Sequence, residues 1–371
     1  MITIIKRNGR TEPLDISKIQ KYTEAAVKGL TNVSQSELEV DAQILFRDGI
    51  TSQEIQKTLI KTAVDKIDID APNWTFVASR LFMFNLYHQV NSFTGYCTLE
   101  KYFARGEKAG RLMLGLKEMY DLEKLDKHIK PERDMLFNYL GVKTLYDRYL
   151  IKDRDSNPIE LPQHMFMAIA MFLAQREEKR EEWAIKFYDM ISQFQVMLAT
   201  PTLSNARTTR HQLSSCYIGS TPDNIEGIFD SYQEMAMLSK FGGGIGWDWT
   251  GIRSMGSYID GHKNAAGGTV PFLKITNDIA IAVDQLGTRK GAIAVYMEPW
   301  HIDINDFLDL KKNSGEERRR AHDLFPAMWL NDLFMERVQQ DAIWTLFDPY
   351  DVKELATLYG EAFSKRYKEL E

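Results

Sequence analysis

Apolar and polar positions follow two different periods in the first 90 residues of the chain. The runs ITIIK and TEPL are strand-like, and Arg-Asn-Gly at residues 7–9 joins them with an Asn-Gly pair that suits a tight hairpin turn. KIQKYTEAAVKGL then has helical spacing, and Gly29 is placed to end that helix. Further helices are predicted after the capping-box sequence TSQE at 51–54 and through FVASRLFMFNLYHQV. We therefore expect a small hairpin-plus-helices domain over residues 1–90.

The rest of the chain shows one change of pattern. Residues 91–195 are mostly helical, and HMFMAIAMFLAQ within them is typical of a buried helix face rather than of a cofactor-binding box. After residue 195, short apolar runs such as VMLA, CYIG, GIGWDW and AIAVYMEPW alternate with helix-like segments and glycine-rich turns. This alternation is typical of an α/β domain with largely buried strands. We expect that domain over residues 196–371, where it ends in the charged helical segment EAFSKRYKELE with no closing strand.

Composition and charge narrow the functional classes. A hydrophobic content of 44% allows a large core, and a net charge of −6 provides no general attraction to nucleic acid. No apolar run approaches the ~20 residues needed to cross a membrane, and the N-terminus lacks a secretory signal. We therefore expect a cytoplasmic protein that binds neither nucleic acid nor a membrane.

The usual motifs for metals and nucleotides are missing from the sequence. The two cysteines and seven histidines lack the spacing of a disulfide framework or a zinc site, so we expect no metal bound to this chain. No P-loop occurs, and the glycines of FGGGIGWDWTG do not fit GxGxxG. Nucleotide binding would need another scaffold.

A set of motifs in the α/β part resembles a known family. ATPTLSNAR, QLSSC, GGGIG, IRSMGSYI, AVDQLGTRKGA, AVYMEPWH and NDLFMERV occur in the order found in the large (alpha) subunit of class I ribonucleotide reductase. The first 90 residues resemble the ATP-cone that begins many of these proteins, with KRNGRTEPLDISKI as its nucleotide-facing hairpin and helix. The resemblance implies an α/β fold with an ATP-cone, a helical region and the first half of a ten-stranded α/β barrel.

The resemblance implies a redox role for Cys216 in LSSC. In the family, this cysteine helps the 2′-hydroxyl of the substrate leave as water and then forms a disulfide with a second cysteine on a later strand. Two thiols within disulfide reach form a two-electron reductant, which an external thioredoxin- or glutaredoxin-like dithiol would restore. A small buried core residue is the alternative for a lone cytosolic cysteine. Cys97 has no such motif, and its role stays open as a core or surface thiol.

The implied substrate is a ribonucleoside diphosphate. Backbone N–H groups in loops rich in Gly, Ser and Thr can bind phosphate or ribose. The resemblance places Thr200, Ser215 and Gly244 at the substrate, with Ser204 of the TPTLS turn as a further candidate. An ordinary turn is the alternative for such a segment.

The resemblance also implies a site for a nucleotide effector that selects which base is reduced. Asp223 corresponds to the carboxylate on the effector ribose, and Arg253 corresponds to the phosphate-binding arginine, a bidentate role that lysine fills less well. Asn224 and Ile252 would flank them. A helix N-cap is the alternative for Asp223, and a surface salt bridge is the alternative for Arg253. Asp260 stands where some relatives have a further arginine.

The loop DQLGTRKG would connect this effector site with the substrate base. Gln285 and Arg289 are its candidate contacts, and its glycines permit two conformations. A plain flexible turn is the alternative.

The ATP-cone implies a third nucleotide site that switches activity on and off. Its candidate residues are Lys6, Glu12, Lys18, Ser52 and His88. Relatives inhibited by dATP carry a histidine where this chain has Gln56 and a basic residue, often lysine, at His88. Because imidazole lacks a permanent charge near neutral pH, we expect weak inhibition by dATP or none. Ordinary surface lysines and a capping serine are the alternative.

Part of the family's catalytic machinery would fall after residue 371. This part comprises the thiyl-radical cysteine, its neighbouring asparagine and glutamate, and the disulfide partner of Cys216. We therefore expect an oligomeric, split or truncated enzyme, completed by a second large-subunit chain and by a small subunit whose metal and tyrosine generate the radical. The alternatives are a non-catalytic nucleotide sensor and a scaffolding half-barrel. The sensors that carry such cones pair them with a zinc ribbon, for which this chain has no cysteine cluster.

Overall fold

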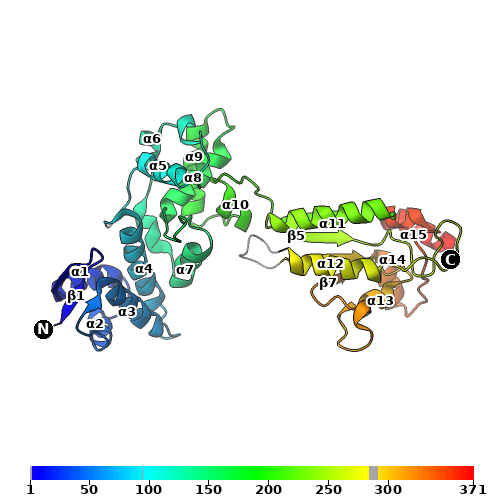
Figure 1. The fold of residues 1–371 in the computed structure, drawn as a ribbon, viewed down its shortest axis with the longest axis horizontal. Helices are drawn as coiled ribbons and strands as arrows, with labels where there is room; N and C mark the ends of the chain where they lie inside the picture. The colour runs from blue at the N-terminus through cyan, green and yellow to red at the C-terminus, as the bar shows by residue number, and fades with distance from the viewer. Residues whose placement is uncertain (1, 94, 284–290) are drawn as a thin grey trace. The chain divides into compact units, whose positions relative to one another are not determined.

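The computed structural model describes residues 2–93, 95–283 and 291–371. Contacts within the chain group them into two compact units, of which unit 1 ends at Leu213 and unit 2 begins at Ser214 (Figure 1). Each unit has hydrophobic clusters of its own. None of the described helices is long and apolar enough to span a membrane.

Unit 1 opens with a three-stranded sheet of order β2-β1-β3. β1 and β2 pair antiparallel and form the predicted hairpin, whose turn contains Gly9 at a φ of +81°, a conformation that glycine adopts without strain. The elements of this part are β1 Thr3–Ile5, β2 Thr11–Pro13, β3 Ile50–Thr51, α1 Ile16–Val27, α2 Gln35–Gln43, α3 Ser52–Asp65 and α4 Trp74–Asn91.

Two predicted helix signals are present in this part. Gly29 follows α1 with a φ of +73°, as expected for a residue that ends a helix. At the start of α3, the backbone N–H of Glu54 donates to Thr51 Oγ1 at 3.1 Å, and the N–H of Thr51 donates to Glu54 Oε2 at 2.8 Å. This reciprocal pair is the capping box read from TSQE.

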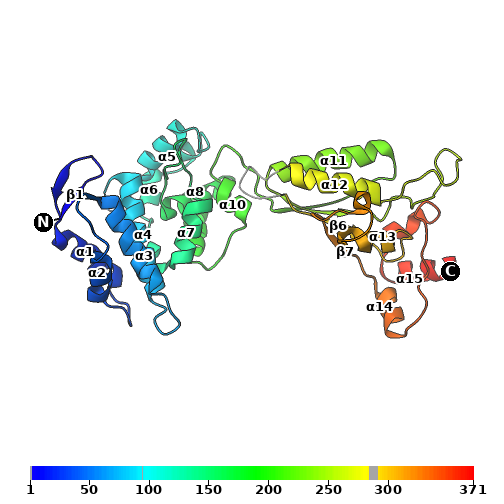
Figure 2. The same ribbon diagram turned by 60° about the horizontal axis from the view of Figure 1, so that its bottom comes forward.

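The remainder of unit 1 is helical, as predicted. Its elements are α5 Leu99–Lys108, η1 Lys117–Met119, α6 Leu122–Asp126, η2 Pro131–Leu136, α7 Tyr139–Arg148, α8 Pro162–Ala174, α9 Arg180–Ser192 and α10 Thr200–Asn205. α8 is buried over most of its surface, which confirms the buried helix read from its Met and Phe positions. α4 packs against both α3 and α7, so one helix links the hairpin part to the helical part (Figure 2).

Two segments before residue 214 differ from expectation. VMLA at 196–199 forms no strand, and Met197 is 79% exposed. TPTLS lies in the short helix α10 rather than in a turn, with Pro201 in the first helical turn, where a missing N–H costs nothing. Residues 196–213 pack within unit 1 because Leu203 and Ala206 join its core.

Unit 2 contains a four-stranded parallel sheet of order β4-β5-β6-β7. α11 and α12 lie side by side along one face of this sheet (Figures 1 and 2). The elements are β4 Cys216–Ser220, α11 Ile225–Lys240, β5 Gly244–Asp248, α12 Val270–Ala282, β6 Ile293–Met297, α13 Ile304–Leu308, η3 Asp309–Lys311, η4 Glu317–Arg319, β7 Phe325–Met328, α14 Asp332–Gln339, η5 Lys353–Thr357 and α15 Gly360–Leu370. The expected α/β class is confirmed, and three of its strands match CYIG, GIGWDW and AIAVYMEPW.

Burial in this sheet depends on strand position. β5 and β6 alternate buried side chains such as Trp247 and Val295 with half-buried ones. β4 lies at one end of the sheet and is mostly exposed, with Ile218 at 91%. The expectation of largely buried strands is therefore wrong for β4, because an end strand has a neighbour on one side only.

Candidate functional site

A pocket of about 700 Å³ lies in unit 1 where the hairpin, α1, α3 and α4 meet. Apolar side chains from all four elements form part of its wall, and polar and charged groups form the rest. Its lining consists of Ile4, Lys6, Arg7, Asn8, Leu14, Asp15, Lys18, Ile19, Lys21, Tyr22, Ser52, Ile55, Gln56, Leu59, Leu81, His88 and Ser92. A pocket with both kinds of wall suits a ligand that has a flat apolar part and a charged part.

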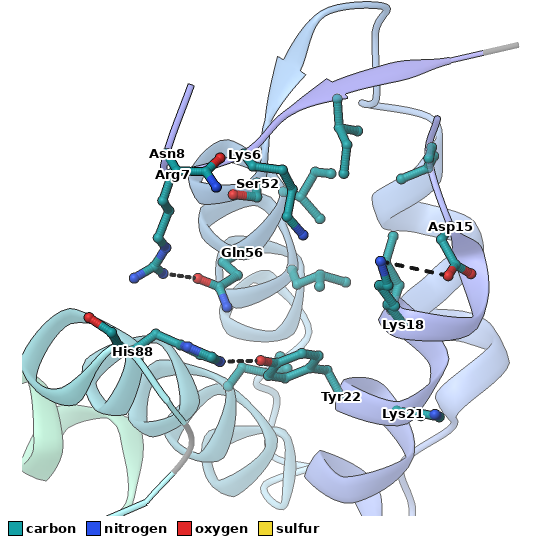
Figure 3. A pocket seen from close by; sticks show the side chains of 17 residues that line it. Lys6, Arg7, Asn8, Asp15, Lys18, Lys21, Tyr22, Ser52, Gln56 and His88 are labelled. Carbon is teal, nitrogen blue, oxygen red and sulfur yellow. Dashed lines mark hydrogen bonds and ion pairs between the residues drawn. The ribbon is translucent and has the colours of Figure 1, made fainter. Parts of the chain in front are cut away.

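Lysines from two elements reach this pocket. Lys6 follows β1, and Lys18 lies in the first turn of α1 (Figure 3). The Glu12 carboxylate contacts both, at 3.3 Å from Lys6 Nζ and 3.2 Å from Lys18 Nζ, and hydrogen bonds from Lys18 and Lys6 lower the pKa of Glu12. Lys21 adds another cation to the lining, where Asp15 is the sole carboxylate. The pocket therefore favours an anionic ligand.

Arg7 connects the pocket to α3 and α4. Its Nη2 donates to Gln56 Oε1, a hydrogen bond marked in Figure 3. The two atoms are 2.6 Å apart, and the same Nη2 donates to Asn85 Oδ1 at 2.7 Å. Burial lowers the pKa of Arg7, although an arginine remains protonated at neutral pH. Amides rather than carboxylates hold this guanidinium, so its positive charge is not neutralised by an ion pair in the described part of the chain.

His88 faces the pocket from the last turn of α4. Its Nε2 lies 2.5 Å from the hydroxyl of Tyr22, so the two side chains are hydrogen-bonded across the pocket (Figure 3). Burial lowers the pKa of His88, and the nearby charges of Arg7 and Lys6 lower it further. The imidazole is therefore neutral at pH 7 and contributes polarity rather than charge.

The pocket gathers most of the residues that the sequence associated with the ATP-cone. Four of them line it, namely Lys6, Lys18, Ser52 and His88, and Glu12 contacts two of these. Arg7 and Tyr22 were not anticipated. Tyr22 lies four residues after Lys18 on α1 and so shares its helix face, which is a signal that the sequence did contain.

A second group of candidates lies at the start of two neighbouring strands in unit 2. Cys216 begins β4 and pairs in register with Gly244, which begins β5. The N–H of Gly244 donates to the carbonyl of Ser215 at 2.7 Å, and Ser215 Oγ lies 3.6 Å from Cys216 Sγ. Cys216 is exposed and carries a free thiol, and a Cβ at Gly244 would lie 3.7 Å from Sγ. Ser215, Cys216 and Gly244 thus form one accessible group, and the buried-core alternative for Cys216 is excluded.

The other two substrate candidates belong to α10 in unit 1. Thr200 is the first residue of this helix and is exposed. Its Oγ1 lies 3.1 Å from the hydroxyl of Tyr149. Ser204 is half-buried on the same helix.

A third group of candidates follows the carboxyl ends of β4 and β5. Asp223 follows β4, and Arg253 follows β5; because the strands are parallel, their carboxyl ends meet at one edge of the sheet. Arg253 Nε lies 2.9 Å from Asp223 Oδ2 and 3.1 Å from Oδ1, and the backbone N–H of Arg253 also donates to Oδ1 at 3.1 Å. The guanidinium further donates to the carbonyl of Tyr258 and lies 5.0 Å from the ring of Tyr350.

The flanking residues have separate structural tasks. Asn224, not Asp223, is the N-cap of α11, since its Oδ1 accepts from the N–H of Gly227 at 2.8 Å. The N-cap alternative for Asp223 is therefore wrong, whereas Arg253 does form an ion pair. Ile252 is buried. Gln285 and Arg289 lie outside the described residues.

The remaining cysteine has a different environment from Cys216. Cys97 is half-buried, its Sγ lies 3.8 Å from Arg105 Nη2, and burial raises the pKa of its thiol. A raised pKa leaves little of the reactive thiolate at neutral pH. Among residues 2–93, 95–283 and 291–371, no three His, Cys, Asp or Glu side chains are arranged to hold a metal ion.

Three family models match the chain in consecutive segments. A model described as "ATP cone domain" matches residues 2–89, one described as "Ribonucleotide reductase, all-alpha domain" matches 135–211, and one described as "Ribonucleotide reductase, barrel domain" matches 214–371. The pocket lies within the first segment, and the parallel sheet with Cys216 lies within the third. The expected order of cone, helical region and barrel segment is confirmed.

Curated relatives match over the full length of the chain. The chain is 70% identical over 371 residues to the "Ribonucleoside-diphosphate reductase subunit alpha" of Helicobacter pylori (strain ATCC 700392 / 26695), covering 100% of this chain and 47% of that protein. The protein of the same name from Chlamydia trachomatis serovar D is 39% identical, over 100% of this chain and 36% of its own length. The large subunit from Monkeypox virus is 34% identical, over 98% and 48%. The chain thus spans about half the length of these relatives or less.

Proposed function

Because the chain belongs to the ribonucleotide reductase family, we propose that it takes part in reducing ribonucleoside diphosphates to deoxyribonucleotides, as the N-terminal portion of a large subunit. The observation that carries this proposal is the exposed thiol of Cys216 beside Ser215 and Gly244 at the start of two parallel strands. In this group the thiol of Cys216, the hydroxyl of Ser215 and the backbone of Gly244 are accessible side by side. Such a group can contact a small polar substrate.

In the proposed chemistry, two thiols act as the reductant. The ribose loses its 2′-hydroxyl as water and gains a hydrogen at C2′, which requires two electrons and two protons. Cys216 and a second cysteine supply both and become a disulfide, which an external dithiol of the thioredoxin or glutaredoxin type reduces again. The initiating radical would come from a small subunit with a metal and a tyrosine.

We propose that the second cysteine and the radical cysteine belong to polypeptide that corresponds to the remaining length of the relatives. This polypeptide, as a continuation of this chain or as a second chain, would supply further strands to the sheet. Exposed apolar side chains on the end strands β4 and β7, such as Ile218 and Phe325, are consistent with such an addition. A cytoplasmic location fits the same chemistry, because dithiol reductants keep thiols reduced there.

Two nucleotide sites would regulate this reaction. The pocket around Lys6, Lys18 and His88 has the charge and size for ATP or dATP, and its aromatic and apolar walls suit a base. The group around Asp223 and Arg253 would bind a deoxynucleoside triphosphate effector, with the carboxylate on the ribose and the guanidinium on a phosphate.

The testing experiment is reconstitution from purified components. The chain is mixed with the completing polypeptide, the small subunit, an effector and a dithiol, and deoxyribonucleotide formation is measured. We expect turnover in the full mixture and none when the completing polypeptide is omitted. Turnover by the chain and small subunit alone would contradict the split site. A stable, stoichiometric complex that binds effector yet stays inactive would favour a scaffold.

A further inference from the structure

Arg207 and Glu160 form an ion pair that is completely buried within unit 1. Arg207 Nε donates to Glu160 Oε2 at 3.0 Å, Nη2 is bound to Oε1, and the hydroxyl of Tyr102 donates to Oε2 at 2.8 Å. The N–H of Ile151 also donates to Oε1, at 2.6 Å. A buried pair of charges adds little to stability over an apolar core of equal volume. We therefore look for its role in the groups that it orients.

The remaining donors of Arg207 hold two backbone segments. Nη1 donates to the carbonyl of Leu203 in α10 at 2.6 Å, and Nη2 donates to the carbonyl of Tyr149 at 3.0 Å. α10 has six residues, too few to persist as a helix without tertiary contacts. Arg207 therefore fixes α10 against the residue that ends α7.

Tyr149 completes the connection through its side chain. Its hydroxyl lies 3.1 Å from Thr200 Oγ1 at the first residue of α10. Tyr149 is half-buried, whereas Thr200 is exposed. When an anion binds at Thr200, the threonine proton is directed to the anion and the tyrosine proton to the threonine oxygen, since each hydroxyl has one proton and can accept as well. Such a chain of hydroxyls strengthens the outer donor.

We propose that Tyr149 is a positioning residue for Thr200, held in place by the Glu160–Arg207 pair, and that it acts on the affinity for the substrate diphosphate rather than on the chemical step. The inference rests on the proposed function in one respect: it takes Thr200 as a residue that touches the substrate. In this inference Tyr149 acts through Thr200.

A double-mutant cycle in the reconstituted reductase tests this inference. The variants are Tyr149→Phe, Thr200→Val and both together, assayed for KM and kcat with a ribonucleoside diphosphate. We expect each single substitution to raise KM about 3- to 10-fold, the range for one lost hydrogen bond, while kcat stays within about twofold. The double variant is expected to be no worse than the more affected single variant, because both remove the same interaction.

Tyr146→Phe is the matched control on α7. The ring of Tyr146 packs against Phe82, and its hydroxyl has no hydrogen-bond partner in the described parts of the chain, so KM is expected to be unchanged. A thermal melt of each variant confirms folding.

The outcomes separate this inference from the proposed function. An increase in KM for Thr200→Val without one for Tyr149→Phe overturns the positioning role alone, as do effects that multiply in the double variant. An unchanged KM for Thr200→Val overturns the substrate assignment of Thr200 and this inference together, while leaving the redox role of Cys216 to its own test.

Discussion

Asp223 and Arg253, thirty residues apart in the sequence, bind each other through both carboxylate oxygens at the carboxyl edge of the parallel sheet. The carboxylate also accepts from the backbone N–H of Arg253, so it fixes the position of the loop as well as of the guanidinium. The tip of the arginine remains directed to the Tyr258 carbonyl and the Tyr350 ring. An effector phosphate would therefore meet an arginine that is already oriented, which lowers the entropic cost of binding.

The first prediction concerns this pair. Asp223→Asn keeps the shape of the side chain but removes the negative charge that orients Arg253. It also replaces one of the two acceptor oxygens proposed to serve Arg253 and the ribose by an NH2 donor. We expect deoxynucleoside triphosphate binding to weaken by about 1–3 kcal/mol, the range for a lost charge-assisted hydrogen bond. Equilibrium dialysis of the chain measures the affinity. Asp341→Asn, at an exposed position after α14 in the same unit, is the control and is expected to bind as the unmodified chain does. Equal affinities of both variants would contradict the effector assignment.

The second prediction separates the two cysteines. Cys216→Ser removes the only exposed thiol of the described chain and is expected to abolish dithiol-dependent turnover in the reconstituted reductase. Effector binding should be preserved, because Cys216 lies at the opposite end of β4 from Asp223. Cys97→Ser is expected to keep activity, since the Cys97 thiol is half-buried with a raised pKa. Full activity of the Cys216→Ser variant would end the redox assignment.

Local signals in the sequence were sufficient for much of the fold. The capping box of Thr51 and Glu54, and the helix end at Gly29, depend on neighbouring residues and were predicted correctly. β3 was missed because a strand of two residues shows no alternation. β7 was missed because Pro326 interrupts it; such a proline is tolerated here because β7 lies at the end of the sheet. VMLA resembled a strand, yet it has no strand partner in the described chain.

The candidate sites were predictable to a different degree. The motifs pointed to Cys216, Asp223 and Arg253 as individual residues, but not to the pairing of the last two. That pairing depends on the parallel register of β4 and β5, a long-range feature that spacing along the chain does not contain. Tyr149 was missed for the same reason, because its contact with Thr200 bridges segments that are 51 residues apart.

The third prediction concerns charge in the cone pocket. Burial and the charges of Arg7 and Lys6 lower the pKa of His88 below its usual 6.5, so this side chain adds no positive charge at pH 7.5. His88→Lys introduces a permanent charge and is expected to tighten dATP binding about 3- to 10-fold in calorimetry at pH 7.5. His211→Lys, on an exposed histidine elsewhere in unit 1, is the control. The unmodified chain should show no change in dATP affinity from His88 between pH 7 and 8. A fall in affinity from pH 7 to pH 8 that is absent from His88→Lys would mean that His88 is charged at pH 7.

The last prediction uses a carboxyl group at the carboxyl end of β6. Glu298 is half-buried near Asp248. Desolvation is the main reason why the pKa of its carboxyl group rises to about 7, and the charge of Asp248 acts in the same direction. The hydrogen bond that Trp300 Nε1 donates to Glu298 Oε2 at 2.8 Å opposes this rise. The unfolded value of this pKa is 4.5. The folded state thus binds the proton more tightly, so the stability associated with the protonated form is complete below pH 4.5 and is lost as the pH rises through 7.

Glu298→Gln removes this titration while keeping the shape of the side chain. The advantage of the variant in free energy of unfolding should therefore grow between pH 5 and pH 8, by about 2–3 kcal/mol for a shift of this size. Urea titrations followed by tryptophan fluorescence measure it, because Trp247, Trp249 and Trp300 lie buried in unit 2. Asp134 in unit 1, whose pKa burial raises to about 6, titrates equally in both proteins and cancels in the difference. If the difference between variant and unmodified chain is the same at pH 5 and pH 8, Glu298 is ionised in the folded protein throughout and the inferred environment at this edge of the sheet is incorrect.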